Sequence, residues 1–325
     1  MRTYDKLDMS RLSYAQTDPM ANLVHDVAFP PFQTFDEAGK FRETEERAHY
    51  LEVDANQVSK YTVGLEYDFT DAFRYYKNEP MGAYFKFSNI DLDQPKQRGY
   101  ASAAAMIEAK RAWLTKLLKK KKEKALYTVI DTDANFEGAT YYNDAGTAWS
   151  SVGTSDPGSD VAAGKLVVPE INAGIMSYTA FLYCQRNTTI KASTTVMGPK
   201  RDGAVDPTIT PEFLKNYFQL DYLWIAKGDL ITDSADSTDT TRTEIWGDQM
   251  LLFYHNPTPG PEEPAFIKHL YYAPMGKGSG TGGWFVTNSK DDRPGGVGVQ
   301  YWDIWNYHQF LVQEKSLGYR IDALY

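Results

Sequence analysis

The most regular pattern of hydrophobic and polar positions lies at residues 97–126, QRGYASAAAMIEAKRAWLTKLLKKKKEKAL. This segment has no proline, Gly99 is its only glycine, and strong helix formers fill most of it. We expect a helix about 40 Å long, with Ser102 as a candidate N-cap and other parts of the chain lying against it. Its apolar residues recur at helical spacing, which predicts one buried stripe made of Ile107, Trp113, Leu114, Leu117 and Leu118.

Two extended segments precede this helix. Residues 1–31 show no sustained period and contain three prolines, which is typical of an extended arm. Residues 32–67 have two ends with extended patterns around the charged segment RETEER, residues 42–47. In the second end, residues 61–67, apolar and polar positions alternate with the period of a strand. The pattern predicts a long hairpin. Because an isolated hairpin is only marginally stable, we expect it to lie on another surface, in the same chain or a neighbour.

The rest of the chain mixes helical and extended patterns. Residues 68–80 predict a short helical turn, and residues 126–132, LYTVIDT, predict a buried strand. Strands are also predicted at residues 221–227 and 245–255 and near the C-terminus, where apolar residues alternate. The predicted N-caps of three further helices are Asp156, Ser177 and Thr210. This sequence of elements predicts an α+β fold.

Aromatic residues make up 14% of the chain, with 23 Tyr and 7 Trp. Tyr and Trp bury a large area while keeping a polar group, and they are enriched where protein surfaces meet. The composition alone supports extensive interfaces and a tyrosine-rich core equally well.

The formal charge of −9 argues against broad binding to nucleic acid. The segment from Lys110 to Lys124 is a local exception, with eight Lys and Arg residues against one acid, Glu123. Within it, four consecutive lysines cover every face of a helical turn, so some of them must approach whatever the helix packs on: Lys119, Lys120, Lys121 and Lys122. Three interpretations stay open, in decreasing order: a solvated face, contact with an acidic surface of another copy, and contact with nucleic-acid phosphates.

No motif for catalysis, a cofactor or a metal is present in the sequence. The glycine-rich GKGSGTGG lacks the ending of a phosphate-binding loop, and DTDANFEG has Phe136 where a calcium loop needs glycine. The five histidines are scattered, and the acidic segment 228–244 is interpreted as a solvated loop in preference to a cation site. Cys184, the single cysteine, has the apolar context of a buried thiol. No apolar run is long enough to span a membrane, and no secretory signal is recognisable.

The order of parts resembles the major capsid protein of tailed bacteriophages, with its Hong Kong 97-like fold. An extended arm, a charged hairpin, one long helix, an α/β region and terminal strands follow one another over essentially the whole chain. The segment INAG at 171–174 departs from the PN that many members have there. Local stretches are also similar to that family: Trp149 followed by SDPGSD, ITPEFLKNYFQLDYLWIAKG, IWGDQMLLFYHNP with AFIKHLYY, and EKSLGYRIDALY.

The resemblance implies a division of the chain into the parts of that fold. The N-terminal arm would be residues 1–31 and the hairpin, called the E-loop, residues 32–67. The peripheral or P-domain would be residues 68–160 with the spine helix at 97–126. The axial or A-domain would be residues 161–295, and return strands of the P-domain would follow at residues 296–325.

The resemblance also implies a structural role without enzymatic activity, cofactor or metal. Copies would form hexamers and pentamers of an icosahedral head shell around packaged double-stranded DNA, in a virion assembled in the host bacterial cytoplasm. The further partners it implies are a portal and scaffolding or decoration proteins, with weak non-specific DNA contact. An encapsulin-like shell or a tail structural protein is the alternative, and a glycan-active enzyme, for which no carboxylate pair is recognisable, comes third.

Within this role, charged residues at the hairpin tip are expected to fix the register between subunits: Arg42, Glu45, Glu46 and Arg47. The lysines from Lys119 to Lys122 are expected to face the shell interior or a partner. Some relatives cross-link a hairpin lysine to an asparagine near the terminal strands. Lys40 or Lys60 and Asn306 are the matching residue types here, without supporting spacing.

Overall fold

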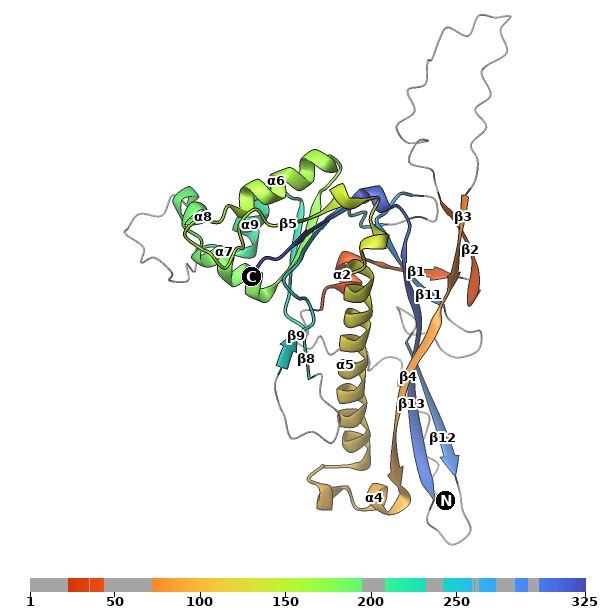
Figure 1. The fold of residues 1–325 in the computed structure, drawn as a ribbon. Coiled ribbons are helices and arrows are strands. Elements are labelled where there is room, and N and C mark those ends of the chain that lie inside the picture. The colour runs from red at the N-terminus through yellow and green to blue at the C-terminus, as the bar shows by residue number, and fades with distance from the viewer. Residues whose placement is uncertain are drawn as a thin grey trace, which may run out of the picture.

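The computed structural model describes residues 23–34, 36–43, 72–194, 208–231, 242–258, 260, 263–272, 284–291 and 298–325. In these residues one long helix, α5, connects two five-stranded sheets (Figure 1). The first sheet lies along the helix, and the second lies near its C-terminal end together with most of the shorter helices. No helix in the described part of the chain has the length and apolar character needed to cross a membrane.

Helix α5 spans Ala103–Ile130, and it begins and ends later than the predicted 97–126. Ser102 is its N-cap, as predicted, and its hydroxyl accepts a hydrogen bond from the Ala105 amide at 3.1 Å. The strand predicted at 126–132 is wrong, because residues 126–130 continue the helix. Leu126 and Ile130 extend a line of buried residues spaced four apart, and their burial outweighs the preference of the β-branched residues for strands.

Only part of the predicted apolar stripe of α5 is buried. Leu114 and Leu118 pack with Ile304 against the first sheet, whereas Trp113 and Leu117 leave 60% and 46% of their area exposed. The prediction of a single buried stripe containing all of them is therefore wrong for Trp113 and Leu117. Near the start of the helix, Met106 packs with residues of α4 (Asn89–Asp93) and of the first sheet.

The first sheet is centred on β13 (Val299–Val312), which pairs antiparallel with every neighbour it has in the described residues. β4 (Glu79–Ser88) runs along one edge of β13, and β12 (Trp284–Asp291) and β11 (Ile267–Tyr272) follow one another along the other. β1 (Pro31–Thr34) pairs parallel with β11. Terminal antiparallel strands were predicted, and β12 and β13 confirm them.

The helical turn predicted at residues 68–80 is wrong. This segment contributes β3 (Ala72–Lys77) and the start of β4, and β3 pairs antiparallel with β2 (Ala38–Glu43). Alternate residues of β4 turn toward α5, among them Phe85 and Phe87, which pack with Trp302 of β13. The alternation of more and less exposed residues continues along β4 beyond Pro80. Because the residues that turn inward pack on α5, this segment is a strand and not a helical turn.

The second sheet has the order β5-β14-β10-β6-β7, and it separates two clusters of buried apolar residues. One cluster includes the end of α5, and the other includes α6 (Pro157–Val167), α7 (Tyr178–Arg186), α8 (Thr188–Ser193) and α9 (Pro211–Tyr217). The three N-caps predicted for α6, α7 and α9 are confirmed, since Asp156, Ser177 and Thr210 each accept a backbone hydrogen bond. The strands of this sheet are β5 (Tyr142–Asp144), β14 (Gly318–Asp322), β10 (Met250–Phe253), β6 (Ala173–Ser177) and β7 (Tyr222–Ala226).

The segment 296–325 is shared between the two sheets. β13 belongs to the first, but β14 lies in the second between β5 and β10. Likewise β11 and β12, from the predicted A-domain range 161–295, lie in the first sheet. Arg320 of β14 donates to the Ile130 carbonyl at 3.0 Å and to Asp133 and Asp322, so it fastens the end of α5 to the second sheet.

Two adjacent leucines of α5 provide a test of how the helix packs. Replacing Leu118 by Ala is expected to lower the free energy of unfolding by about 2–5 kcal/mol, because it removes a side chain that is 3% exposed in the contact with Ile304. Leu117→Ala, its neighbour at 46% exposure, is expected to change it by less than about 1 kcal/mol. Denaturant unfolding of both variants measures the difference, and equal losses would contradict this orientation of the helix.

Candidate functional site

A buried carboxylate on α5 holds the short helix α2 (His25–Ala28) in place. Glu123 has no exposed area, and one of its oxygens accepts from the Val24 amide at 3.2 Å and from Trp246 Nε1 at 2.7 Å. The other oxygen accepts from the His25 amide at 2.9 Å and lies 2.6 Å from His25 Nδ1. The two amides are at the start of α2, where a helix has unpaired N–H groups and favours a negative charge.

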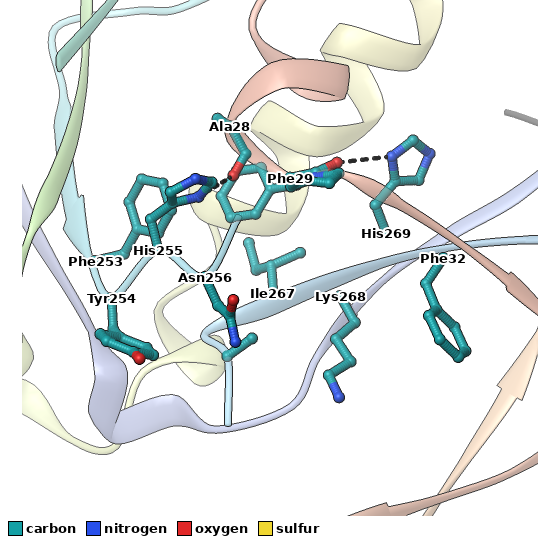
Figure 2. Close-up of a pocket in the computed structure, with 12 residues that line it drawn as sticks. Ala28, Phe29, Phe32, Phe253, Tyr254, His255, Asn256, Ile267, Lys268 and His269 are labelled. Atoms are coloured by element: carbon teal, nitrogen blue, oxygen red, sulfur yellow. Dashed lines mark hydrogen bonds between the residues drawn. The ribbon is translucent and has the colours of Figure 1, made fainter. Parts of the chain in front are cut away.

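Histidines on two other segments bind the opposite end of α2. His255 Nδ1 donates to the Ala28 carbonyl and His269 Nδ1 donates to the Phe29 carbonyl, each at 3.0 Å (Figure 2). Such carbonyls at the end of a helix have no partner within the helix itself. A helix of four residues is not stable alone in water, so these side chains from α5, β11 and the segment after β10 make it part of the fold.

A second ion pair lies beside the first. Lys122 has no exposed side-chain area, and its Nζ is 3.3 Å from Asp26 Oδ1. Asp26 also lies 3.3 Å from His25 Nε2 and keeps 40% of its side chain exposed. The site therefore combines two carboxylates and two basic groups, and we call it the ionic junction: His25, Asp26, Lys122 and Glu123.

The protonation states in the ionic junction follow from its geometry. Burial lowers the pKa of His25, but the carboxylates of Asp26 and Glu123 favour the imidazolium more strongly, so the pKa of His25 lies above its ordinary value. Burial raises the pKa of Asp26, and the nearby His25 and Lys122 outweigh this and hold that pKa well below its ordinary value. Burial lowers the pKa of Lys122, although Asp26 opposes the change.

Two further histidines close to the ionic junction are held neutral. Burial, and then the positive charge of Lys122, lowers the pKa values of His269 and His308, that of His308 to about 3. Burial also lowers the pKa of His255. The arrangement suits the attachment of a chain segment, because each of its two carboxylates lies beside a basic group. Among the described residues, no group of three or more metal-ligating side chains has a geometry suited to a metal ion.

The apolar side of this attachment is drawn in Figure 2. Phe29 stacks on Phe253 with ring centroids 4.8 Å apart, and both belong to the cluster that contains the end of α5. A pocket lies where the chain leaves α2 toward β1, and Lys268 lines it. Lys268 Nζ donates to the Gly260 carbonyl at 2.7 Å, and burial lowers its pKa to about 8.

The structure separates the four lysines that the sequence grouped together. Some of them were expected to approach the surface that the helix packs on, and Lys122 confirms this. The expectation that Lys122 faces the interior of a shell or a partner is wrong, because the ionic junction encloses it. Lys120 contacts Asp229 of β8 (Asp229–Ile231) at 2.5 Å. Lys121 is exposed and Lys119 is partly exposed, so their contact with a shell interior or a partner stays a prediction.

The predicted hairpin contacts fall mostly outside the described residues. Arg42 belongs to β2, where its backbone pairs opposite Phe73 of β3. Glu45, Glu46, Arg47 and the strand predicted at 61–67 lie outside the described residues, so their roles stay predictions.

Asn306, the asparagine considered for cross-linking, has no exposed area and lies in β13 between Met81 and Trp284. A neighbouring lysine would have to open the sheet to reach it. The acidic segment 228–244 contains β8 and β9 (Arg242–Glu244), and its middle, residues 232–241, lies outside the described residues.

Sequence reasoning missed the ionic junction. Glu123 stands in KKKKEK, which is typical of a solvated helix surface, and its partners lie 98 to 123 residues away. One signal was present: Lys122 occupies the four-residue spacing of Leu114, Leu118, Leu126 and Ile130. A lysine in a buried register needs a buried partner.

The fold is shared with known shell proteins, although neither a protein-family model nor a curated protein matches the sequence. A phage-related protein from Bordetella bronchiseptica RB50 is 17% identical, with a TM-score of 0.68 over 97% of this chain and 95% of that one. The capsid of the cyanophage P-SCSP1u gives a TM-score of 0.53 at 10% identity over 91% and 86%. The SrpI encapsulin of Synechococcus elongatus PCC 7942 gives 0.54 at 10% identity over 91% and 85%.

These likenesses define the class of fold. The chain has the α+β, Hong Kong 97-like fold of phage capsid proteins, as its order of parts predicted.

The role of Glu123 can be tested by changing it to Gln. The amide keeps the shape, but it removes the charge and turns an NH2 group toward one pair of donors, either Val24 N with Trp246 Nε1 or the amide and ring of His25. We therefore expect a loss of about 3–5 kcal/mol in the attachment of α2. Hydrogen exchange at the Val24 and His25 amides measures this loss. Glu137→Gln, an exposed change of the same kind, is the matched control. Unchanged exchange in Glu123→Gln would contradict the assignment.

The shifted pKa values of His25, His269 and His308 predict that the stability of the fold depends on pH. His269 and His308 have lowered pKa values, so their contribution is present above about pH 6.5 and is lost as the pH falls, by up to about 1.4 kcal/mol per pH unit for each group. His25 has a raised pKa, so its contribution is present below about pH 6.5 and is lost as the pH rises through the folded value. We therefore expect the stability due to these three groups to be greatest near pH 6.5, to fall below it because of His269 and His308, and to fall above it because of His25.

Denaturant unfolding across this pH range measures the effect. His25→Gln is expected to remove the alkaline decrease and to retain the acid one. A wild-type stability that stays constant from neutral to mildly acidic pH would contradict the neutral state of His269 and His308.

Proposed function

We propose that this chain is a major capsid protein of a tailed bacteriophage, a structural protein whose copies form hexamers and pentamers of an icosahedral head around double-stranded DNA. The observation that carries the proposal is the fold, which a phage-related protein shares over 97% of this chain and a cyanophage capsid shares over 91%. In this proposal the protein resides in the virion, after assembly in the cytoplasm of the host bacterium.

The construction of the subunit supports a role that depends on contacts between chains. Large hydrophobic side chains are exposed on several separate elements, including Trp113 of α5, Leu166 of α6 and Tyr84 of β4, which are 60%, 84% and 62% exposed. Such residues on different faces are typical of a protein with several interfaces. The ionic junction would fix the start of the chain on each subunit, so that the preceding arm leaves from a defined point.

An encapsulin-like shell is the second candidate, because the encapsulin neighbour has a TM-score close to that of the cyanophage capsid. The two candidates differ in the content of the shell. Shells isolated from the native source that hold nuclease-protected DNA support a phage head, whereas shells that hold a cargo protein support an encapsulin. In a phage head the further partners would be a portal and scaffolding or decoration proteins.

Negative-stain electron microscopy of the purified chain tests the shared part of both candidates. We expect capsomers or closed shells, because repeated weak contacts between identical subunits close a finite assembly. Monodisperse small particles at all concentrations would contradict a shell role.

The hairpin charges are tested by reversing Arg42 and Arg47 to Glu. We expect fewer closed shells at an unchanged yield of folded subunit, because like charges would then meet across the proposed contact. Lys96→Glu, an exposed reversal on η1 (Pro95–Arg98), is the control. Counting closed shells by electron microscopy gives the result, and a normal yield in the double reversal would exclude a register function for these residues.

A further inference from the structure

The outward side of α5 carries a line of exposed residues that no other element in the described part of the chain covers. Trp113 and Leu117 are one turn apart, and Ala105, Ala109 and Lys121 extend the same four-residue spacing in both directions. All five are exposed, whereas Leu114 and Leu118 of the same helix pack against the first sheet. We call this line the outer stripe of α5. The interaction that the structure records for Trp113 is with Lys110, whose Nζ lies 5.8 Å from the ring centroid.

The charges around the outer stripe are mainly positive, although Glu108 precedes Ala109 and Asp229 of β8 pairs with Lys120. Lys110, Lys121 and Lys124 are exposed. Between residues 109 and 125 the single acid is Glu123, and it is enclosed in the ionic junction. The surface thus presents apolar groups with cations beside them, in a chain whose net charge is −9. A complementary partner would have an apolar line bordered by carboxylates.

The apolar component distinguishes between kinds of partner. Cations bind nucleic-acid phosphates, and the aliphatic side chain of Leu117 would add nothing to that binding. A protein surface gains by removing both Leu117 and Trp113 from water. Ala105 and Ala109 have small side chains, so the surface of α5 is shallow next to Trp113. A partner helix can therefore approach α5 closely there, with the side-chain ridges of one helix in the grooves of the other.

We infer that the outer stripe of α5 is a docking surface for an amphipathic helix of a partner protein, whose apolar side covers Trp113 and Leu117 and whose carboxylates face Lys110, Lys121 and Lys124. The inference goes beyond the proposed shell role. It concerns the surface of a single chain, so it stands or falls independently of whether the shells enclose DNA or cargo.

The test uses the full chain and a labelled synthetic peptide helix that has leucines along one side and glutamates along its borders. Fluorescence anisotropy is expected to give a dissociation constant on the order of micromolar, weakened about tenfold or more in the double variant Trp113→Ser, Leu117→Ser. Leu166→Ser on α6, which is 84% exposed, is the matched control and is expected to bind as the wild type does. A peptide with lysines in place of the glutamates is expected to bind at least about tenfold more weakly.

Each other outcome overturns the inference. Absence of peptide binding, or equal binding by the double variant, removes the docking surface. If a double-stranded DNA oligonucleotide binds as tightly as the peptide and loses affinity in the double variant, the surface is one for nucleic acid. If the double variant fails to form assemblies of the chain while still binding the peptide, the occupant is a second copy. Circular dichroism of the variants confirms that they are folded.

Discussion

A charged carboxylate enclosed away from water, that of Glu123, sets the conditions for much of this structure. An unpaired charge in this position would cost several kcal/mol, so the fold must bring donors to it. It receives two backbone amides, an imidazole and an indole N–H, from segments far apart in the chain. The start of the described chain, the long helix and the segment leading into β10 are thereby fixed to one another at a single point.

The long helix is packed mostly on one side, and its two ends are held by different contacts. Its N-terminal half packs on the first sheet and on α4, through residues such as Leu114 and Met106. Its C-terminal end is fixed by the ionic junction on one side and by Arg320 on the other. The same helix therefore links two sheets that share no strand, and its length follows from the distance between them rather than from a compact core.

The parts of the fold that depend on neighbouring residues were predictable from the sequence. The N-caps Ser102, Asp156, Ser177 and Thr210 act on amides three residues away, so the local sequence contains both partners. The failures lie where tertiary contacts decide. Residues 126–130 have the composition of a strand but continue a buried helical line, and residues 72–77 pair with β2 instead of closing a helical turn.

The ionic junction could not be predicted, because no local pattern connects its members. His25 and Glu123 are separated by 98 residues, and His25 was a lone histidine in the sequence. Glu123 was counted as one acid within a basic segment, whereas the structure gives it the most constrained position in the helix. Only the position of Lys122 in an apolar register pointed toward a buried pair, and that register becomes evident once the helix is known to continue to Ile130.

Some lysines of the basic segment form ion pairs within the chain, and this changes what can be inferred from that segment about function. Of the four lysines at 119–122, Lys122 neutralises Asp26 and Lys120 joins α5 to β8, so two of the positive charges act within the subunit. Lys121, one of those that remain outside, lies one turn after Leu117, so that side of α5 is amphipathic rather than purely cationic. A lysine-rich helix in this acidic chain is therefore poor evidence for DNA contact. Part of the positive charge of this segment is neutralised by carboxylates within the chain, and the exposed apolar groups favour a protein partner.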